Sequence, residues 1–265
     1  MEVRALLIGD VVGKPGRELL KKALPELIEE RNVDFVIVNG ENAVQGSGIN
    51  AKSFKEIVRS GADVVTLGDH TWNRKEAVPV IESEERCLRP MNYSPKAVGK
   101  GARVYTLKNG MRALVAIVLG RVFMPPVDCP FRAIDNALTN TASDVEFRFI
   151  EVHAEATSEK IAMGWKLDGK ATCVYGTHTH VPTADARVLP KGTAYITDLG
   201  MTGPHDSVIG RSKVNVLHRF ETSMHAPFDV AHGDVRMCGV FLTLESSTGL
   251  ATSIERIEIR ENDLR

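Results

Sequence analysis

The chain has 265 residues, 43% of them hydrophobic and 25% charged, and its formal net charge is -1 at pH 7. These fractions are typical of a globular protein in water, and a net charge near zero gives no overall attraction to nucleic acid or to an anionic membrane. Any affinity for a phosphate-bearing substrate must therefore be local. No apolar stretch approaches transmembrane length, so we expect no membrane partner and no stable nucleic-acid binding.

The four cysteines are far apart in the sequence and form no CxxC pair: Cys87, Cys129, Cys173 and Cys238. This spacing argues against a disulfide framework and against a structural zinc site. Residues 1–8 are too short and too charged to serve as a signal peptide. We therefore expect a location in the reducing cytoplasm.

The first third of the chain alternates strand and helix patterns. Apolar residues recur on one face of a predicted helix over residues 15–30, whose first turn contains Pro15. Further helices are predicted at 51–60 and 74–82, and buried strands at 3–8, 34–38 and 63–67. This alternation indicates parallel strands joined by right-handed crossovers.

The rest of the chain predicts antiparallel strands as well. Asn109 and Gly110 indicate a hairpin between strands 102–107 and 112–119. Beyond the hairpin we predict helices at 131–141 and 156–164, and strands at 146–152, 171–175, 193–197, 236–244 and 252–260. The chain has no recognisable linker, so we expect one α/β domain over residues 1–265, with mixed sheets in a sandwich and helices outside.

Five polar clusters each follow a predicted strand, at residues 9–10, 39–42, 68–70, 152–155 and 176–180. Ligands bind at the carboxyl ends of strands in open α/β sheets, so side chains remote in sequence can converge there. The clusters offer carboxylates, a carboxamide and imidazoles but no thiolate, which suits hard or borderline divalent metals. If the backbone at 178–180 is extended, His178 and His180 point to the same side.

Each cluster alone is a weak signal, because a Gly-Asp pair after a strand is commonly a turn and an isolated histidine is commonly structural. Two other catalytic sites are disfavoured. His153 and Glu155 have the HxE spacing of zinc deaminases, but no PCxxC follows. A serine hydrolase would need GxSxG, which residues 46–48 do not supply. The joint pattern of five clusters therefore favours a metal site.

The same clusters carry a family resemblance. IGDVVGKPGR (8–17), NGENA (39–43), TLGDHTW (66–72), HAEATSEK (153–160), GTHTH (176–180) and TAYITDLGMTGP (193–204) resemble, in order, the YmdB family of calcineurin-like metallophosphoesterases. The resemblance implies a four-layer α/β/β/α metallophosphoesterase-like sandwich. It also implies a phosphodiesterase that acts on a small phosphodiester, such as a 2′,3′-cyclic nucleotide, and that forms a homo-oligomer.

The resemblance further implies two divalent or trivalent metal ions, iron or manganese, with magnesium and zinc as open alternatives. By motif, the first ion would be bound by Asp10, Asn42 and His180, and Glu41 would bridge both ions. The second ion would be bound by Asp69, His153 and His178. A metal-bridging hydroxide would attack phosphorus, and His70 would give a proton to the leaving group.

One residue departs from the family pattern. The family motif at this point is usually Gly-Asn-His, whereas residues 68–70 are Gly-Asp-His, so Asp69 replaces the usual Asn. Two divalent ions with Asp10, Glu41 and hydroxide leave the site about one unit positive, and ionised Asp69 cancels that charge. We therefore expect tighter metal binding and weaker attraction of an anionic substrate. A phosphomonoesterase or nucleotidase, or a regulatory metal-binding protein with weak or no catalysis, remains an alternative. Lys160 is expected on a solvated helix face.

Overall fold

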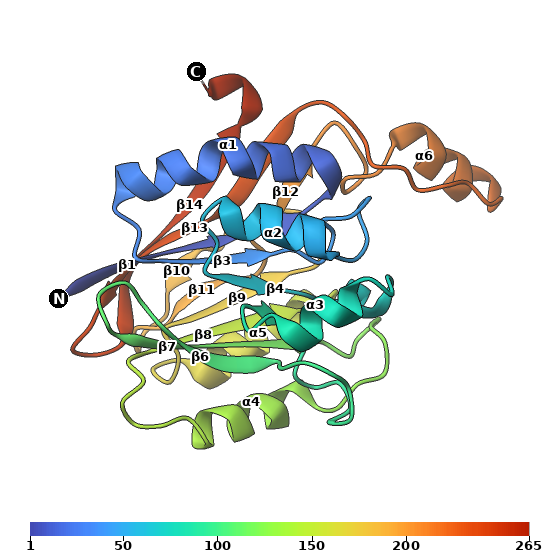
Figure 1. Cartoon of the computed structure of the whole chain (residues 1–265). Coiled ribbons are helices and arrows are strands. Elements are labelled where there is room, and N and C mark those ends of the chain that lie inside the picture. Colours follow the sequence, from blue (N-terminus) through green and yellow to red (C-terminus); the bar gives the residue numbers. More distant parts are fainter. Residues whose placement is uncertain (265) are drawn as a thin grey trace.

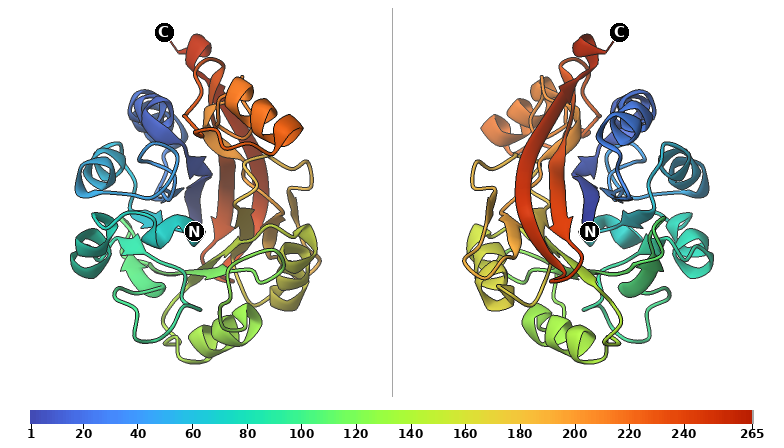
Figure 2. Two further views of the ribbon diagram at one scale, coloured as in Figure 1. Left: turned by 90° about the vertical axis from the view of Figure 1, so that its right-hand side faces the viewer. Right: turned by 90° about the vertical axis from the view of Figure 1, so that its left-hand side faces the viewer.

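Two β-sheets lie face to face in the computed structural model, which describes residues 1–264 (Figures 1 and 2). The first sheet has the strand order β2-β12-β13-β1-β3-β4-β5, with β14 beside β13, and the second has the order β10-β11-β9-β8-β7-β6. Helices α1, α2 and α3 cover the outer face of the first sheet, while α4 and α5 cover the second. The four-layer α/β/β/α prediction with mixed sheets is confirmed.

The first sheet consists of β1 (Glu2–Ile8), β2 (Asp10–Val11), β3 (Phe35–Asn39), β4 (Val64–Thr66), β5 (Cys87–Leu88), β12 (Met201–Pro204), β13 (Val235–Glu245) and β14 (Leu250–Arg260). The second consists of β6 (Ala102–Thr106), β7 (Arg112–Leu119), β8 (Phe147–His153), β9 (Cys173–Thr177), β10 (Arg187–Val188) and β11 (Ala194–Ile196). The helices are α1 (Gly13–Arg31), α2 (Ala51–Arg59), α3 (Ala77–Ser83), α4 (Pro130–Thr139), α5 (Thr157–Leu167) and α6 (Lys213–Thr222), with short 3-10 turns η1 (Asp69–Trp72) and η2 (Glu261–Asp263).

The alternating first third folds as its sequence pattern predicts. β1, β3, β4 and β5 run parallel in that order, and α1, α2 and α3 connect them. The antiparallel strand β13 pairs with the other edge of β1, which makes the sheet mixed. The predicted hairpin is confirmed, since β6 and β7 pair antiparallel around Gly110, whose φ of 84° suits glycine.

The core between the sheets is apolar and closed to solvent. Leu7 and Phe35 of the first sheet, and Val115, Phe149 and Tyr175 of the second, are each no more than 1% exposed. Burial of such side chains stabilises the fold by about 1.5–3 kcal/mol each. The packed faces thereby hold the carboxyl ends of β3, β4, β8 and β9 in fixed relative positions.

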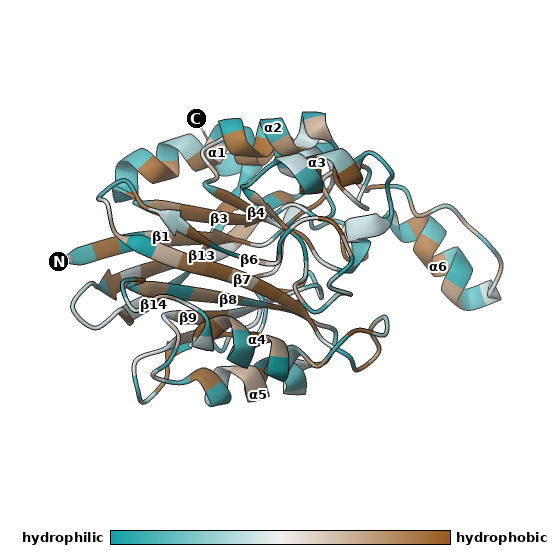
Figure 3. Cartoon of the chain, turned by 60° about the horizontal axis from the view of Figure 1, so that its bottom comes forward, coloured by the Kyte–Doolittle hydropathy of each residue, from teal (hydrophilic) through white to brown (hydrophobic). Residues whose placement is uncertain are grey.

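Several elements were not predicted from the sequence. The short strands β2, β5, β10 and β12 lack enough residues to show a period, and α3 starts at Ala77 rather than residue 74. Helix α6 was also missed because Val216 is its one buried residue, so it shows no core-facing stripe. It projects from the sandwich and carries apolar positions among polar ones (Figure 3). No helix within residues 1–264 is both long and apolar enough to cross a membrane.

Candidate metal centre

The predicted site residues come together where the carboxyl ends of the two sheets meet. Asp10 lies in β2, Glu41 and Asn42 follow β3, and Asp69 and His70 form the start of η1 after β4. On the second sheet, His153 ends β8, while His178 and His180 follow β9. All eight side chains belong to one connected set of contacts: Asp10, Glu41, Asn42, Asp69, His70, His153, His178 and His180.

Four of these residues form a compact group. Ligand atoms of Glu41, Asp69, His153 and His178 all lie within 4.8 Å of one another. His153 Nε2 is 3.3 Å from Glu41 Oε1 and 3.0 Å from Asp69 Oδ1. His178 Nδ1 is 3.2 Å from the same Asp69 oxygen. Two carboxylates and two imidazoles in this arrangement are a suitable donor set for a borderline divalent cation.

The remaining residues lie beside this group. Asn42 Nδ2 is 3.0 Å from Glu41 Oε1 and 3.0 Å from His180 Nε2. His180 Nε2 is 3.9 Å from Asp10 Oδ1, and the other Asp10 oxygen accepts a 3.2 Å hydrogen bond from the backbone N–H of His178. Glu41 is therefore the member of the compact group that also contacts a second set, formed by Asp10, Asn42 and His180.

Asp10 supplies a test of whether a cation fits here. Its side chain is fully buried, and Oδ1 has no hydrogen-bond partner within residues 1–264. A buried carboxylate oxygen without a partner is costly. Burial, and to a smaller extent the neighbouring Glu41 carboxylate, raises the pKa of Asp10 to about 7. A cation beside Oδ1 would satisfy this oxygen, so the residues fit a metal ion.

The contacts of the histidines show which ring nitrogen of each faces the centre. His180 Nδ1 lies 2.9 Å from the Ile209 carbonyl, which can only accept, so Nδ1 carries the proton and the lone pair of Nε2 accepts from Asn42 Nδ2. His178 Nε2 lies 3.3 Å from Glu155 Oε2, and Nδ1, 3.2 Å from Asp69 Oδ1, is the ring nitrogen that faces the compact group. Glu155 therefore orients a candidate ligand, a role that the sequence did not reveal.

His153 is oriented by a buried chain of polar groups. Its Nδ1 lies 2.9 Å from the Thr177 hydroxyl, which in turn donates a 2.8 Å hydrogen bond to Glu151 Oε1. Asn39 Nδ2 and the Tyr175 hydroxyl also donate to the Glu151 carboxylate, at 2.7 and 3.1 Å. Because Thr177 uses its hydrogen toward Glu151, its oxygen accepts from Nδ1–H of His153. Nε2 of His153 faces the Glu41 and Asp69 carboxylates, which raise the pKa of this imidazole against the opposing effect of burial, and a cation bound there would replace the Nε2 proton.

The loop that carries His178 and His180 is not extended, so that expectation is wrong. His178 has φ 95° and His180 has φ 64°, both in the left-handed region that disfavours residues with a side chain. Between them, the backbone N–H and the hydroxyl of Thr179 both donate to Asp198 Oδ2, at 3.1 and 2.7 Å. Hydrogen bonding to Asp198, and not a strand, fixes this turn.

Lys160 also lies elsewhere than expected. Its side chain is fully buried, and Nζ donates a 2.7 Å hydrogen bond to Asp198 Oδ2. The expected solvated helix face is wrong because the buried Asp198 carboxylate needs a cationic partner. Sequence periodicity cannot reveal a pairing between residues 38 positions apart.

The neighbouring histidines favour the ionised forms of Asp69 and Glu41. Burial opposes ionisation of Asp69, but hydrogen bonds from His153 and His178 outweigh it and lower the pKa of this carboxyl. Burial likewise opposes ionisation of Glu41, and His153 outweighs it, so the pKa of Glu41 is lowered to below its usual range. The site thus presents carboxylates suited to holding cations.

His70 borders the centre without belonging to the compact group. Its Nδ1 is 2.7 Å from Asn42 Oδ1 and 3.4 Å from Glu41 Oε1, and its side chain is 30% exposed. Burial lowers the pKa of His70, but the hydrogen bond and charge of Glu41 outweigh burial, and the net shift is upward. His70 therefore lies within reach of both solvent and the centre.

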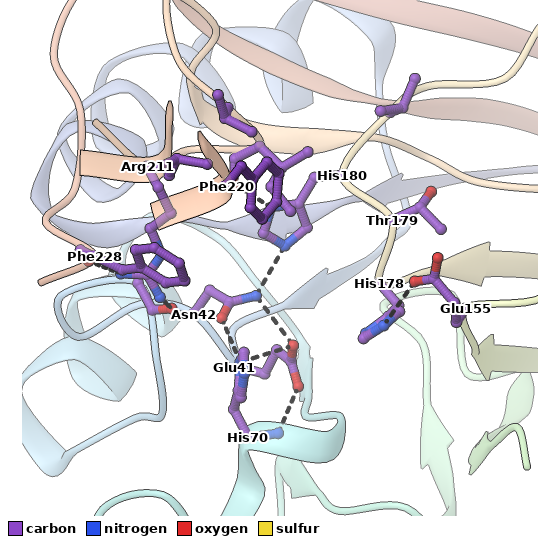
Figure 4. A pocket seen from close by; sticks show the side chains of 15 residues that line it. Glu41, Asn42, His70, Glu155, His178, Thr179, His180, Arg211, Phe220 and Phe228 are labelled. Atoms are coloured by element: carbon purple, nitrogen blue, oxygen red, sulfur yellow. Dashed lines mark hydrogen bonds and ion pairs between the residues drawn. The ribbon is translucent and has the colours of Figure 1, made fainter. Parts of the chain in front are cut away.

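A cleft with a volume of about 580 Å³ opens from the centre (Figure 4). Its inner lining includes Glu41, Asn42, His70, His178 and His180. Its outer lining comes from the segment around α6, which the sequence did not single out. A cleft of this size falls in the usual range for small-molecule sites.

The chain is similar to known proteins over nearly its whole length. A protein of Bacillus subtilis named 2′,3′-cyclic-nucleotide 2′-phosphodiesterase is 44% identical over 262 residues, which cover 99% of each chain. A crystal structure of a hypothetical protein from Thermus thermophilus has a TM-score of 0.92 and 43% identity, and the match covers 98% of this chain and 100% of that one. A crystal structure described as a novel phosphatase from Mycoplasma pneumoniae has a TM-score of 0.92 and 33% identity, covering 98% and 94%. The model of the YmdB-like protein family matches residues 6–257, and the chain therefore belongs to this family.

Proposed function

We propose that this protein is a metal-dependent phosphodiesterase that hydrolyses small phosphodiesters, with 2′,3′-cyclic nucleotides as the preferred class. The observation that carries the proposal is the compact group of Glu41, Asp69, His153 and His178, together with the unpartnered Asp10 oxygen beside His180. The name of the Bacillus subtilis relative supports the substrate class.

In this proposal two metal ions, iron or manganese, occupy the centre. Asp10, Asn42 and His180 would hold one ion, Asp69, His153 and His178 would hold the other, and Glu41 would serve both. The bound ions would activate water and neutralise phosphate charge. Ligation by Asn42 requires its amide oxygen to face the ion, whereas the amide nitrogen now faces Glu41 and His180.

His70 is the proposed proton donor to the leaving oxygen. It is next to a proposed ligand, reaches the cleft, and has its pKa raised by Glu41, so its ring can carry a transferable proton. Substitution His70→Ala should leave two metals bound and should slow alkyl phosphodiesters more than aryl ones, because an alkoxide needs the proton more. Loss of both metals in this variant would contradict the assignment.

The function is tested by one panel of assays. Purified protein is analysed for iron, manganese, zinc and magnesium, then assayed with bis-p-nitrophenyl phosphate, p-nitrophenyl phosphate, and 2′,3′- and 3′,5′-cyclic AMP. We expect turnover of the aryl diester and of 2′,3′-cyclic AMP that a chelator abolishes and metal restores. Absence of turnover with metals bound would overturn the proposal in favour of a regulatory metal-binding protein.

A phosphomonoesterase is the second candidate, and the description of the Mycoplasma pneumoniae structure as a phosphatase favours it. The donor residues suit either class of ester. Faster turnover of p-nitrophenyl phosphate than of both diesters in the same panel would support this alternative.

A further inference from the structure

The cleft beside the metal centre has two chemically different halves. The inner half consists of carboxylate, amide and imidazole groups. The outer half is apolar and is formed by Val208, Ile209, Val216, Phe220 and Phe228, which we call the apolar wall. Figure 4 shows the rings of Phe220 and Phe228 beside the pocket that also contains His180 and Asn42.

The apolar wall exposes large side chains to solvent. Phe220 is 75% exposed and Ile209 is 51% exposed, although both line the cleft. Aromatic side chains at the mouth of a polar site are typical of surfaces that bind a partly apolar ligand. These two side chains thus stay largely uncovered by the rest of residues 1–264.

Hydrogen bonds fix the apolar wall to the metal centre. The Ile209 carbonyl accepts from Nδ1 of His180, a proposed ligand, at 2.9 Å. The Arg211 guanidinium donates to the carbonyl of Gln45 at 2.9 Å and to that of Phe228 at 2.7 Å, and also to the carbonyl of Gly46. The wall is therefore held to the loop that follows Glu41 and Asn42, and not merely placed near it.

The chemistry of the two halves defines what would bind across them. When the phosphodiester group of a substrate lies at the metal centre, the rest of the substrate lies against the apolar wall. A second phosphate does not match the wall, because the Arg211 guanidinium is already bonded to three carbonyl oxygens. A flat, weakly polar ring does match it, since nucleobases stack on aromatic side chains.

We infer that the apolar wall is the binding site for the base of a nucleotide substrate, with Phe220 as the main stacking residue. This inference rests on the proposed function and deepens it. It assigns to α6 and its flanking loops the preference for cyclic nucleotides over cyclic phosphates that lack a base.

The test compares two cyclic phosphates in wild type, Phe220→Ala and the control Leu217→Ala. Leu217 lies on the same helix and is 51% exposed, but it does not line the cleft. The substrates are 2′,3′-cyclic AMP and glycerol 1,2-cyclic phosphate. We expect Phe220→Ala to raise KM for the nucleotide by about fivefold or more and to change KM for the glycerol ester much less. Leu217→Ala should change neither.

Binding of 3′-AMP, measured by calorimetry on the metal-loaded protein, separates this inference from the proposed function. If no cyclic phosphate is hydrolysed, the proposed function fails, yet weaker 3′-AMP binding in Phe220→Ala would still support the base site. If both substrates are hydrolysed with KM values that Phe220→Ala changes equally, the base site is wrong and the function stands. If Phe220→Ala changes the sedimentation mass of the protein but not the ratio of its KM values for the two cyclic phosphates, the apolar wall is a contact between copies of this chain. That result would overturn the inference.

Discussion

The Lys160–Asp198 pair allows a quantitative prediction about the free energy of unfolding. Asp198 also holds residues 178–180, which we call the histidine loop. Both side chains of the pair are 0% exposed, and the Lys160 ammonium is 2.7 Å from Asp198 Oδ2. Removing one partner of a buried ion pair costs about 3–5 kcal/mol, because the other charge stays buried. Lys160→Met keeps most of the apolar stem and removes only the charge. Asp198 retains three donors, from Thr179 N–H, Thr179 O–H and Gly200 N–H, so we expect the lower end, about 3 kcal/mol.

Urea denaturation of the protein checks this value. The matched control is Lys166→Met on the same helix, whose partner Asp135 is 51% exposed. Exposed pairs contribute about 0–1 kcal/mol, so this variant should behave like wild type. The double variant Lys160→Met/Asp198→Asn should recover part of the loss, because it leaves no unpaired charge. Equal stabilities of Lys160→Met and Lys166→Met would refute the reasoning.

Two further predictions concern single positions in the site. Gly176→Ala should destabilise the fold by about 3 kcal/mol or more, because a Cβ would lie 1.8 Å from the Thr197 carbonyl oxygen and 2.6 Å from Lys160 Cδ. The control Gly110→Ala, with no atom within 4 Å of its Cβ, should lose only about 1 kcal/mol from its positive φ, and equal losses in urea melts would argue against this packing. Asp69→Asn removes a charge that contacts His153 and His178, so metal titration should show weaker binding and KM for a phosphodiester should fall. Unchanged metal affinity together with unchanged KM would contradict the charge argument.

Local patterns predicted the part of the fold that local forces determine. The parallel unit from β1 to β4 follows from apolar strands that alternate with amphipathic helices, and the hairpin follows from Asn109 and Gly110. The position of the polar clusters followed from a rule of topology, because side chains after parallel strands share one edge. Glu41 and His153 lie at the ends of strands of different sheets, and they are 3.3 Å apart because these edges of the two sheets meet.

Pairings across the two sheets could not be predicted in the same way. Glu151 looks like one polar residue within an apolar strand, and its role is seen only when Asn39, Tyr175 and Thr177 donate to it. Helix α6 was not predicted because Phe220 lines a cleft and Leu217 is exposed, so its apolar residues form no stripe that faces the core. Both features depend on the packed structure, so neither leaves a periodic signal in the sequence.

The histidine loop shows how the fold and the site depend on each other. Left-handed φ values at His178 and His180 cost free energy, on the order of 1–3 kcal/mol each, and the chain adopts them because Asp10 and Asp198 accept hydrogen bonds from this loop. Asp10 is itself a proposed ligand, whereas the Asp198 carboxylate accepts from buried Lys160 and from Thr179 and Gly200. Loss of Lys160 should therefore weaken metal binding without removing any ligand. Lys160 bonds to Asp198 and not to a proposed ligand, so its loss would act on metal binding through the position of this turn and through the unpaired charge left on Asp198.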